Sequence, residues 1–153
     1  MNYKGRAQCL VIRDNKILMV KHKIGDDEWH CSPGGGIEKG ETPEQAAIRE
    51  LREECLVSGK IIKKLSEYVD PLDDDMMFYT YQVEIGNQVP ALGIDPEIIE
   101  NPVLVGVCWL SLDKICERDR AYLFASGLLS IKQIADELQT WGDDISYPGK
   151  RSE

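Results

Sequence analysis

Three glutamates close together in the sequence, Glu50, Glu53 and Glu54, are the residues of this 153-residue chain best suited to metal chemistry. Residues three and four positions apart share one face of an α-helix, so a helix here would hold the three carboxylates within a sector of about 100°. Anions this close repel one another, and a hard cation with oxygen ligands relieves the repulsion. The pattern predicts a divalent-metal site suited to phosphate chemistry, although a merely solvated, Glu-rich helix face has the same pattern.

A glycine run and a well-marked helix start precede these glutamates. Residues 33–36 read Pro-Gly-Gly-Gly, which allows a tight turn and exposes backbone carbonyls to a hard cation. Thr42 is suited to cap a helix, Pro43 to occupy its first position, and Gln45 to complete a capping box with Thr42. The sequence therefore predicts a helix that begins at residue 43 and carries the glutamates.

The predicted helix has a second, apolar face. It is formed by residues that can pack on a core: Ala47, Ile48, Leu51 and Cys55. Arg49 precedes Glu53 by four positions and can pair with it, which would hold that carboxylate in place. One face of the helix is expected to pack on a sheet while the other stays open to a ligand.

This segment resembles the Nudix box of the Nudix hydrolases. The family pattern is Gly, five residues, Glu, seven residues, then Arg-Glu-apolar-any-Glu-Glu-any-Gly-apolar, and residues 35–57 follow it. The matching positions are Gly35, Glu41, Arg49, Glu50, Leu51, Glu53, Glu54 and Val57. Leu56 stands where the family has glycine. We expect the helix to continue past Leu56 toward Gly59, because Leu56 and Val57 extend its apolar side.

The resemblance implies a role for each matching position. It places the metal-binding carboxylates at Glu50, Glu53 and Glu54, a backbone-carbonyl ligand at Gly34, a bracing salt bridge at Arg49 and a further acid at Glu41. It implies Mg²⁺, with Mn²⁺ as the alternative, since both prefer oxygen ligands. It also implies the activity: hydrolysis of a nucleoside diphosphate linked to another group, by attack of water on phosphorus.

Members of the family often add a glutamate from a later loop, as a metal ligand or a general base. Glu97 and Glu100 lie in such a segment between two prolines, and the acids at 73–75 are further candidates. The general base stays open among these acids and the three box glutamates.

Composition limits the classes of protein. The chain has 42% hydrophobic residues, and its length is that of a single domain, which we expect to span residues 1–153. No apolar run approaches 18 residues and no basic-then-apolar N-terminus is present, so we expect neither a membrane span nor a secretory signal. We therefore expect a cytoplasmic location. The five cysteines, an odd number without a Cys-x-x-Cys pair, are expected to be reduced and mostly buried.

A net charge of −9 argues against a broad nucleic-acid surface but allows a small anionic substrate. Lys21 and Lys23 are candidates to contact its phosphates, or they simply mark an exposed strand end. Five aromatic residues could stack on a base, but aromatics on strands more often belong to the core: Trp29, Tyr68, Phe78, Tyr79 and Tyr81.

The remaining sequence predicts an α/β fold. Strands are expected over residues 6–13, 16–23, 29–32, 60–69, 76–85 and 103–110, with Asp14-Asn15 as a hairpin turn and residues 70–75 as a second turn. A short helix capped by Ser111 and a later helical stripe at residues 124, 128, 131, 135 and 138 would follow, the stripe serving the core or a dimer seam. This order is similar to the Nudix fold, an α/β/α sandwich with a mixed β-sheet and the box as loop-helix-loop, in a monomer or homodimer whose residues 147–153 fray.

Two functional classes stay open at this point. One is a metal-dependent pyrophosphohydrolase that acts on a nucleoside triphosphate, ADP-ribose or a nucleotide sugar. The other is a catalytically idle Nudix-like domain that binds a nucleotide for regulation. The intact carboxylates favour the enzyme, since a regulatory relative would be free to lose them.

Overall fold

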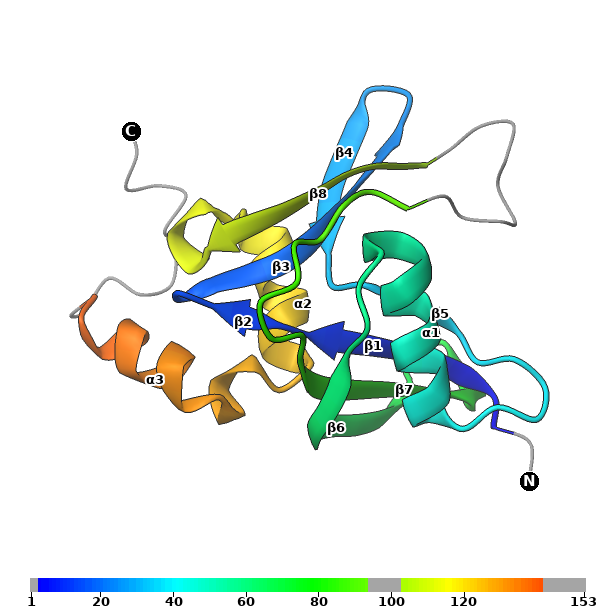
Figure 1. Cartoon of the computed structure of the whole chain (residues 1–153). Coiled ribbons are helices and arrows are strands. Elements are labelled where there is room, and N and C mark those ends of the chain that lie inside the picture. The colour runs from blue at the N-terminus through cyan, green and yellow to red at the C-terminus, as the bar shows by residue number, and fades with distance from the viewer. Residues whose placement is uncertain (1–2, 94–102, 142–153) are drawn as a thin grey trace.

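Two four-stranded β-sheets and three α-helices form the molecule (Figure 1), a computed structural model that describes residues 3–93 and 103–141. Sheet A has the strand order β5-β1-β7-β6, with bounds Gly34–Gly36, Gly5–Leu10, Asp73–Glu84 and Lys60–Asp70. It is a mixed sheet, because β1 and β7 run parallel while the other pairs are antiparallel. The predicted α/β class with a mixed sheet is therefore confirmed.

Sheet B is antiparallel and centres on β3. It contains β2 (Ile12–Arg13), β3 (Lys16–Ile24), β4 (Asp27–Cys31) and β8 (Leu104–Ser111), and both β4 and β8 pair with β3. The division into two sheets was not predicted. The strand expected over residues 6–13 is split, since β1 ends at Leu10 in sheet A and β2 begins at Ile12 in sheet B. The predicted turn is present, because Asp14 and Asn15 both have positive φ, at 53° and 58°, as the tight β2–β3 hairpin requires.

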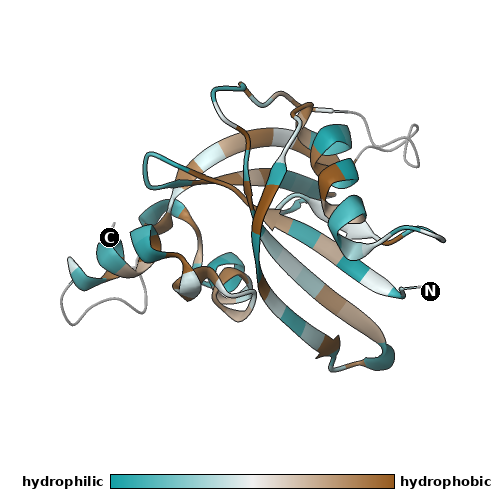
Figure 2. Cartoon of the chain, turned by 60° about the horizontal axis from the view of Figure 1, so that its bottom comes forward, coloured by the Kyte–Doolittle hydropathy of each residue, from teal (hydrophilic) through white to brown (hydrophobic). Residues whose placement is uncertain are grey.

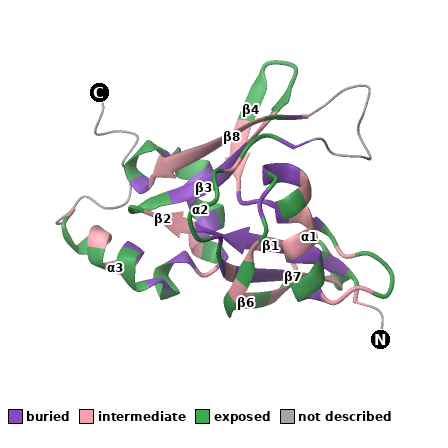
Figure 3. Cartoon of the chain, in the orientation of Figure 1, coloured by how far each residue is buried: buried purple, intermediate pink, exposed green. Residues whose placement is uncertain are grey.

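Helix α1 (Pro43–Cys55) begins as predicted. The Thr42 side chain accepts from the Gln45 backbone N–H, and the Gln45 side chain accepts from the Thr42 N–H, so the capping box is complete. The buried face of α1 packs against β1 residues Ala7 and Cys9. Figure 3 shows buried residues gathered along β1, β3 and one side of α1.

The end of α1 differs from the prediction. The helix stops at Cys55, and Leu56 is its C-cap in the left-handed conformation, with φ 56° and ψ 36°. The expected extension toward Gly59 is wrong because the Leu56 side chain does not continue the apolar face: it is 58% exposed, and Val57 enters the core instead. Leu56 therefore occupies the backbone conformation for which glycine is the usual residue.

The opposite face of sheet A is covered by α2 (Glu117–Ala125) and the turn after it. Ser126 accepts from the Gln8 side chain, and its carbonyl accepts from Ser66 on β6. The predicted C-terminal stripe is not one helix: Gly127, with φ 98°, ends α2, and η2 (Leu128–Ser130) and α3 (Lys132–Gln139) follow. A second hydrophobic core forms here, and it includes the stripe residues Leu128 and Ile131. The core use of the stripe is therefore supported.

The remaining predicted elements are close to their expected places. β6 and β7 form a tighter hairpin than expected, since residues 73–75 belong to β7 and only Pro71 and Leu72 lie between the strands. The short helix after Ser111 is the 3₁₀ turn η1 (Leu112–Lys114). Figure 2 shows apolar and polar residues alternating along the strands, as expected for a sheet with differently packed faces. Within the described ranges, no helix is both long and apolar enough to cross a membrane.

Candidate functional site

The carboxylate face of α1 lies against the glycine strand β5. The Gly34 backbone N–H donates to Glu54 Oε1 at 2.8 Å, and Glu54 is only 8% exposed. A Cβ added to Gly35 would lie 2.3 Å from Glu50 Oε1, so only glycine leaves room for the Glu50 carboxylate there. By contrast, a Cβ on Gly36 would meet nothing within 4 Å. The glycine run is thus required where the strand faces α1.

Arg49 forms hydrogen bonds with three carboxylates around this face, and a fourth, that of Glu38, lies 3.8 Å from its Nη1. Its Nε and Nη2 donate to the two oxygens of Glu41 at 2.8 and 3.0 Å, and its Nη1 donates to Glu50 at 2.9 Å and to Glu53 at 3.3 Å. Its Nη2 also donates to the Gly36 carbonyl at 2.8 Å. The predicted pair between Arg49 and Glu53 is present, and the same guanidinium joins Glu41 on the loop to Glu50 on the helix.

The charges of this network shift the pKa values of its members. The bidentate hydrogen bond from Arg49 lowers the pKa of Glu41, against the opposing effect of burial, and the Glu38 N–H adds to the lowering. The hydrogen bond to Glu41 in turn raises the pKa of Arg49. Both groups are therefore charged over the whole neutral range, and the loop that carries Glu41 is held to α1 by a charge-assisted pair.

The donors on this face are oxygens, the ligand type that Mg²⁺ and Mn²⁺ prefer, so the residues fit a hard divalent cation. Across residues 3–93 and 103–141, no three acidic, histidine or cysteine side chains already converge on one point that could hold a metal. Glu50 and Glu53 turn toward Arg49, while Glu54 turns toward the Gly34 N–H. Rotation of these side chains would be needed to bring the carboxylates together. The Gly34 carbonyl as a ligand stays a prediction.

The thiols nearest the carboxylates are held in their protonated form. Burial, followed by the negative charge of Glu54, raises the pKa of both Cys31 and Cys55 to about 12. Burial also raises the pKa of Cys9, whose Sγ donates to the Ala47 carbonyl. All five cysteines are free, as expected, but most of them are not buried: Cys9 and Cys55 are buried, Cys31 and Cys108 are half-buried, and Cys116 is exposed. Protonated thiols with raised pKa values are poor nucleophiles and poor metal ligands.

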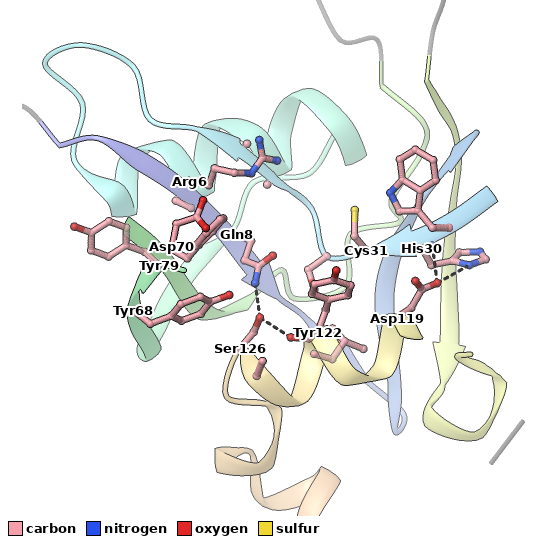
Figure 4. Close-up of a pocket in the computed structure, with 18 of the residues that line it drawn as sticks. Arg6, Gln8, His30, Cys31, Tyr68, Asp70, Tyr79, Asp119, Tyr122 and Ser126 are labelled. Carbon is pink, nitrogen blue, oxygen red and sulfur yellow. Dashed lines mark hydrogen bonds and ion pairs between the residues drawn. The ribbon is translucent and has the colours of Figure 1, made fainter. Parts of the chain in front are cut away.

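A cavity of about 920 Å³ lies next to the glycine strand, on the α2 side of sheet A. Figure 4 shows side chains from β1, β4, β6, β7 and α2 converging on it. Aromatic rings form part of its lining, and Tyr68 and Phe78 stack with their centroids 5.3 Å apart. Gly34 and Gly35 line it as well, so the cavity and the carboxylate face of α1 share the same short strand. The lining aromatics are Trp29, Tyr68, Phe78, Tyr79 and Tyr122.

This cavity is lined by four of the five aromatic residues that were candidates, from the sequence, to stack on a base. Tyr81 does not line it: it is buried under α1, and its hydroxyl donates to Glu44 at 3.0 Å. Tyr122, which the sequence analysis did not single out, lies on α2 and is largely exposed at the cavity. Its position could not be read from local spacing, because α2 reaches the cavity only through the fold.

Polar side chains from distant segments complete the cavity. Gln8 donates through Nε2 to Thr80 Oγ1 at 2.9 Å and to Ser126 Oγ at 2.7 Å. Asp119, 4% exposed, accepts from the His30 backbone N–H at 2.9 Å and so ties α2 to β4. Burial lowers the pKa of His30, and the nearby Asp119 partly offsets this effect. The His30 ring is therefore mainly neutral at pH 7.

The cations at the cavity are not the predicted ones. Lys21 and Lys23 both approach Glu28, at 3.1 and 3.8 Å, and neither lines the cavity. Arg6 and Arg118 line it instead. Arg118 approaches Asp119 at 3.3 Å and Asp27 at 3.9 Å, whereas Arg6 forms no ion pair with any residue that the structure describes. The sequence contained one signal for the position of Arg6. Arg6 and Gln8 alternate along the strand with the buried Ala7 and Cys9, so their side chains lie on the face of the sheet opposite to those two residues.

The predicted additional acids Glu97 and Glu100 lie outside the described residues. Residues 147–153, predicted to fray, lie outside them too. The acids at 73–75 begin β7 directly after the β6–β7 turn, and none of them lines the cavity, although the preceding residues 70–72 do. The box glutamates and Arg49 are brought together with Glu41, but the assignment of a general base stays a prediction.

Comparison with known proteins identifies the class. The sequence profile described as the NUDIX domain matches residues 3–130. Human diphosphoinositol polyphosphate phosphohydrolase 3-alpha is 35% identical over 86 residues, which cover 54% of this chain and 52% of that protein. The mouse diphosphoinositol polyphosphate phosphohydrolase 2 is 42% identical over 62 residues, covering 39% and 34%. The matches thus span about half or less of these relatives.

Solved structures share the fold. A NUDIX hydrolase from Nitrosomonas europaea superposes with a TM-score of 0.62 at 22% identity, over 78% of this chain and 63% of that one. A MutT NUDIX hydrolase from Burkholderia pseudomallei gives a TM-score of 0.60 at 19% identity, over 81% and 98%. With the profile match over most of its length, the chain belongs to the Nudix family. The resemblance seen in residues 35–57 is confirmed.

Proposed function

We propose that this protein is a metal-dependent pyrophosphohydrolase that cleaves the diphosphate linkage of a small nucleotide derivative. The observation that carries the proposal is the shared strand β5: one side faces the carboxylates of α1, and Gly34 and Gly35 also line the aromatic cavity. A nucleotide with its base in the cavity would place its phosphates along β5, next to Glu50 and Glu54. This arrangement joins a base site to a phosphate site.

Each part of the proposed site has a role. Glu50, Glu53 and Glu54 would hold Mg²⁺, or Mn²⁺ in its place, and the bound ion would supply charge neutralisation at the pyrophosphate and a lower pKa for an attacking water. Arg49 orients Glu50 and Glu53 and keeps the Glu41 loop against the helix. Arg6, a cavity cation without an ion pair in the described chain, contacts a substrate phosphate.

The charges in the cavity favour a nucleotide over the substrates named for the sequence relatives. A diphosphoinositol polyphosphate carries many phosphates around one ring and requires many cations. In the described part of the chain, Asp70 and Asp119 bring carboxylates to the cavity lining, and Arg118 is already engaged by Asp119. Its aromatic rings match a planar base, because base–aromatic stacking needs only a flat face. A nucleotide derivative is therefore the better fit for this cavity.

The proposal is tested by product release from nucleoside triphosphates, ADP-ribose, nucleotide sugars and dinucleotides, with and without Mg²⁺ or Mn²⁺. Glu54→Gln should reduce metal-dependent turnover of the best substrate about 100-fold or more, because it removes a charged ligand at nearly constant volume. Glutamine keeps an oxygen that can accept from the Gly34 N–H, so the metal-free melting temperature should hold or rise as the repulsion falls.

Glu84→Gln is the matched control, since Glu84 is an exposed acid at the end of β7 and lines no part of the cavity. It should leave turnover unchanged. Parent-like turnover by Glu54→Gln across a Mg²⁺ titration would refute the metal assignment. Nucleotide binding without hydrolysis of any member of the panel would instead favour the idle, nucleotide-binding alternative.

A further inference from the structure

The amide of Gln8 is held in one orientation at the cavity. Its Nε2 is hydrogen-bonded on two sides, to Thr80 Oγ1 and to Ser126 Oγ. The Ser126 hydroxyl has a single hydrogen, which it donates to the Tyr122 carbonyl at 2.8 Å, so toward Gln8 its oxygen acts as an acceptor. The atom of Gln8 that faces Ser126 must therefore be the nitrogen, because the amide oxygen cannot donate.

This orientation leaves Gln8 Oε1 as a fixed acceptor. Figure 4 shows the amide nitrogen directed at Ser126 and the oxygen on the other side of the group. Both N–H bonds are used within the protein, and Oε1 has no hydrogen-bond partner among the residues of the described ranges. A half-buried carbonyl oxygen at a cavity wall is stabilised when it accepts a hydrogen bond from a ligand N–H. A ligand carbonyl at the same place would be repelled, because both oxygens carry a partial negative charge.

A second acceptor lines the same cavity. Asp119 of α2, which is buried, offers only oxygens and accepts from the His30 N–H, whereas Arg6 and Arg118 bring donors to the lining. The Tyr68 and Phe78 rings offer an apolar stacking surface in this cavity. The cavity thus combines a place for a planar ring with hydrogen-bond acceptors at its polar wall.

We infer that Gln8 determines base specificity, with its Oε1 accepting a hydrogen bond from the exocyclic amino group of a cytosine or adenine nucleotide. The inference rests on the proposed nucleotide function and names the bases that the site prefers. A uracil or hypoxanthine base presents a carbonyl oxygen at the same position and is disfavoured. One net hydrogen bond corresponds to a preference of about 10-fold. Specificity at this site then depends on Thr80 and Ser126, which keep the amide from rotating.

Binding of nucleoside monophosphates to the whole protein without metal tests the inference separately from hydrolysis. Calorimetric titration should give CMP a dissociation constant about 10-fold lower than UMP, and AMP one lower than IMP. Gln8→Met, of similar length but without the amide, should weaken CMP binding to the level of UMP. Equal or tighter UMP binding by the parent, or no measurable binding of either pyrimidine nucleotide at millimolar concentrations, would overturn the inference.

Ser126→Ala tests the orientation itself. Without the Ser126 oxygen the amide can rotate, its nitrogen can face the cavity, and the CMP preference should shrink while the protein stays folded. Ser66→Ala is the matched control: Ser66 donates to the Ser126 carbonyl but does not touch Gln8, so the full preference should remain. An unchanged preference in both Gln8→Met and Ser126→Ala would refute the role of Gln8. A clear CMP preference without metal-dependent hydrolysis would refute the proposed enzyme while leaving this inference intact.

Discussion

The two halves of the candidate site are built in opposite ways. The acidic half comes from one stretch of chain, the strand β5, the loop with Glu41 and the helix α1, and its groups are joined by Arg49. The cavity is assembled from segments far apart in the sequence, and its central hydrogen bond joins Gln8 to Ser126, 118 positions later. The first half depends on local spacing and charge, whereas the second depends on the topology of sheet A and α2.

This difference has a functional consequence. A change on the α1 side of β5 should affect metal-dependent chemistry without emptying the cavity. A change at Gln8 or Ser126 in the cavity should affect which base binds without removing the carboxylates. Among the described residues, the two halves share Gly34 and Gly35, which face α1 and also line the cavity. Substitutions that impair one half and leave the other intact would support this division, whereas substitutions that abolish both metal-dependent turnover and base preference would contradict it.

After Glu54→Gln, the largest effect is expected at Gly35. In Gly35→Ala the added methyl group would lie 2.3 Å from Glu50 Oε1, and the carboxylate, as the end of a flexible side chain, must move. Metal-dependent hydrolysis should fall about 10- to 100-fold, the scale expected when a metal ligand loses its orientation. Metal-free CMP binding should change much less, and the melting temperature should stay close to that of the parent.

Gly36→Ala provides the control for this prediction, because its methyl group would meet nothing within 4 Å. It should keep parent-like kinetics under the same Mg²⁺ titration. Equal losses in Gly35→Ala and Gly36→Ala would show that the strand as a whole, and not the space for Glu50, matters.

The next largest effect is expected on stability, at the ion pair between Glu41 and Arg49 that holds the loop against α1. Glu41→Gln removes the charge from the bidentate pair with Arg49 and should lower the free energy of unfolding by about 1 to 2 kcal/mol in metal-free buffer. The folded-state pKa of Glu41 is lowered from its usual 4.5, so this stabilisation is fully present above about pH 4.5 and is lost as the pH falls through the folded-state pKa. The stability gap between the parent and Glu41→Gln should therefore be constant near neutrality and close in acid.

Denaturant unfolding at a series of pH values measures that gap. Lys64, paired with Glu67 on the exposed surface of β6, offers a comparison, since Glu67→Gln breaks an exposed pair and should change stability little at any pH. A gap for Glu41→Gln that widened as the pH fell would contradict the sign of the pKa shift.

The acidic half was predictable because local rules fix it. Thr42, Pro43 and Gln45 define where α1 begins, and the spacing of the glutamates fixes their face whatever the rest of the chain does. Arg6 and Gln8 could not be assigned in this way. Their strand is an ordinary alternation of polar and apolar residues, and only the parallel pairing of β1 with β7 and the placement of α2 turn its polar side into a cavity wall.

Two lysines show that residues near the site in sequence need not lie at it in the fold. Lys21 and Lys23 lie close to the glycine run in sequence, but the β3–β4 hairpin pairs them with Glu28 on the strand that returns beside them. Their nearness to the glycine run along the chain suggested a contact with phosphate. In the fold, the pairing of β3 with β4 places both lysines beside Glu28 instead. Long-range pairing thus decides the outcome, and a single sequence without its fold does not reveal it.

The smallest expected effect lies at Leu56, where the chain departs from the family pattern at the end of the acidic half. Leu56 has a φ of 56° and is 58% exposed, so it carries the cost of a left-handed backbone and buries little surface in return. Leu56→Gly should therefore raise the free energy of unfolding by up to about 1 kcal/mol, a gain partly offset by the greater freedom of glycine in the unfolded chain. Leu56→Ala removes the same side chain but keeps the backbone cost, so it should give no such gain. Thermal melts of both variants separate the two contributions, and turnover per folded molecule should match the parent because Glu53 and Glu54 stay within the helix. A lower midpoint for Leu56→Gly than for Leu56→Ala would show that the left-handed cap carries no cost that glycine relieves.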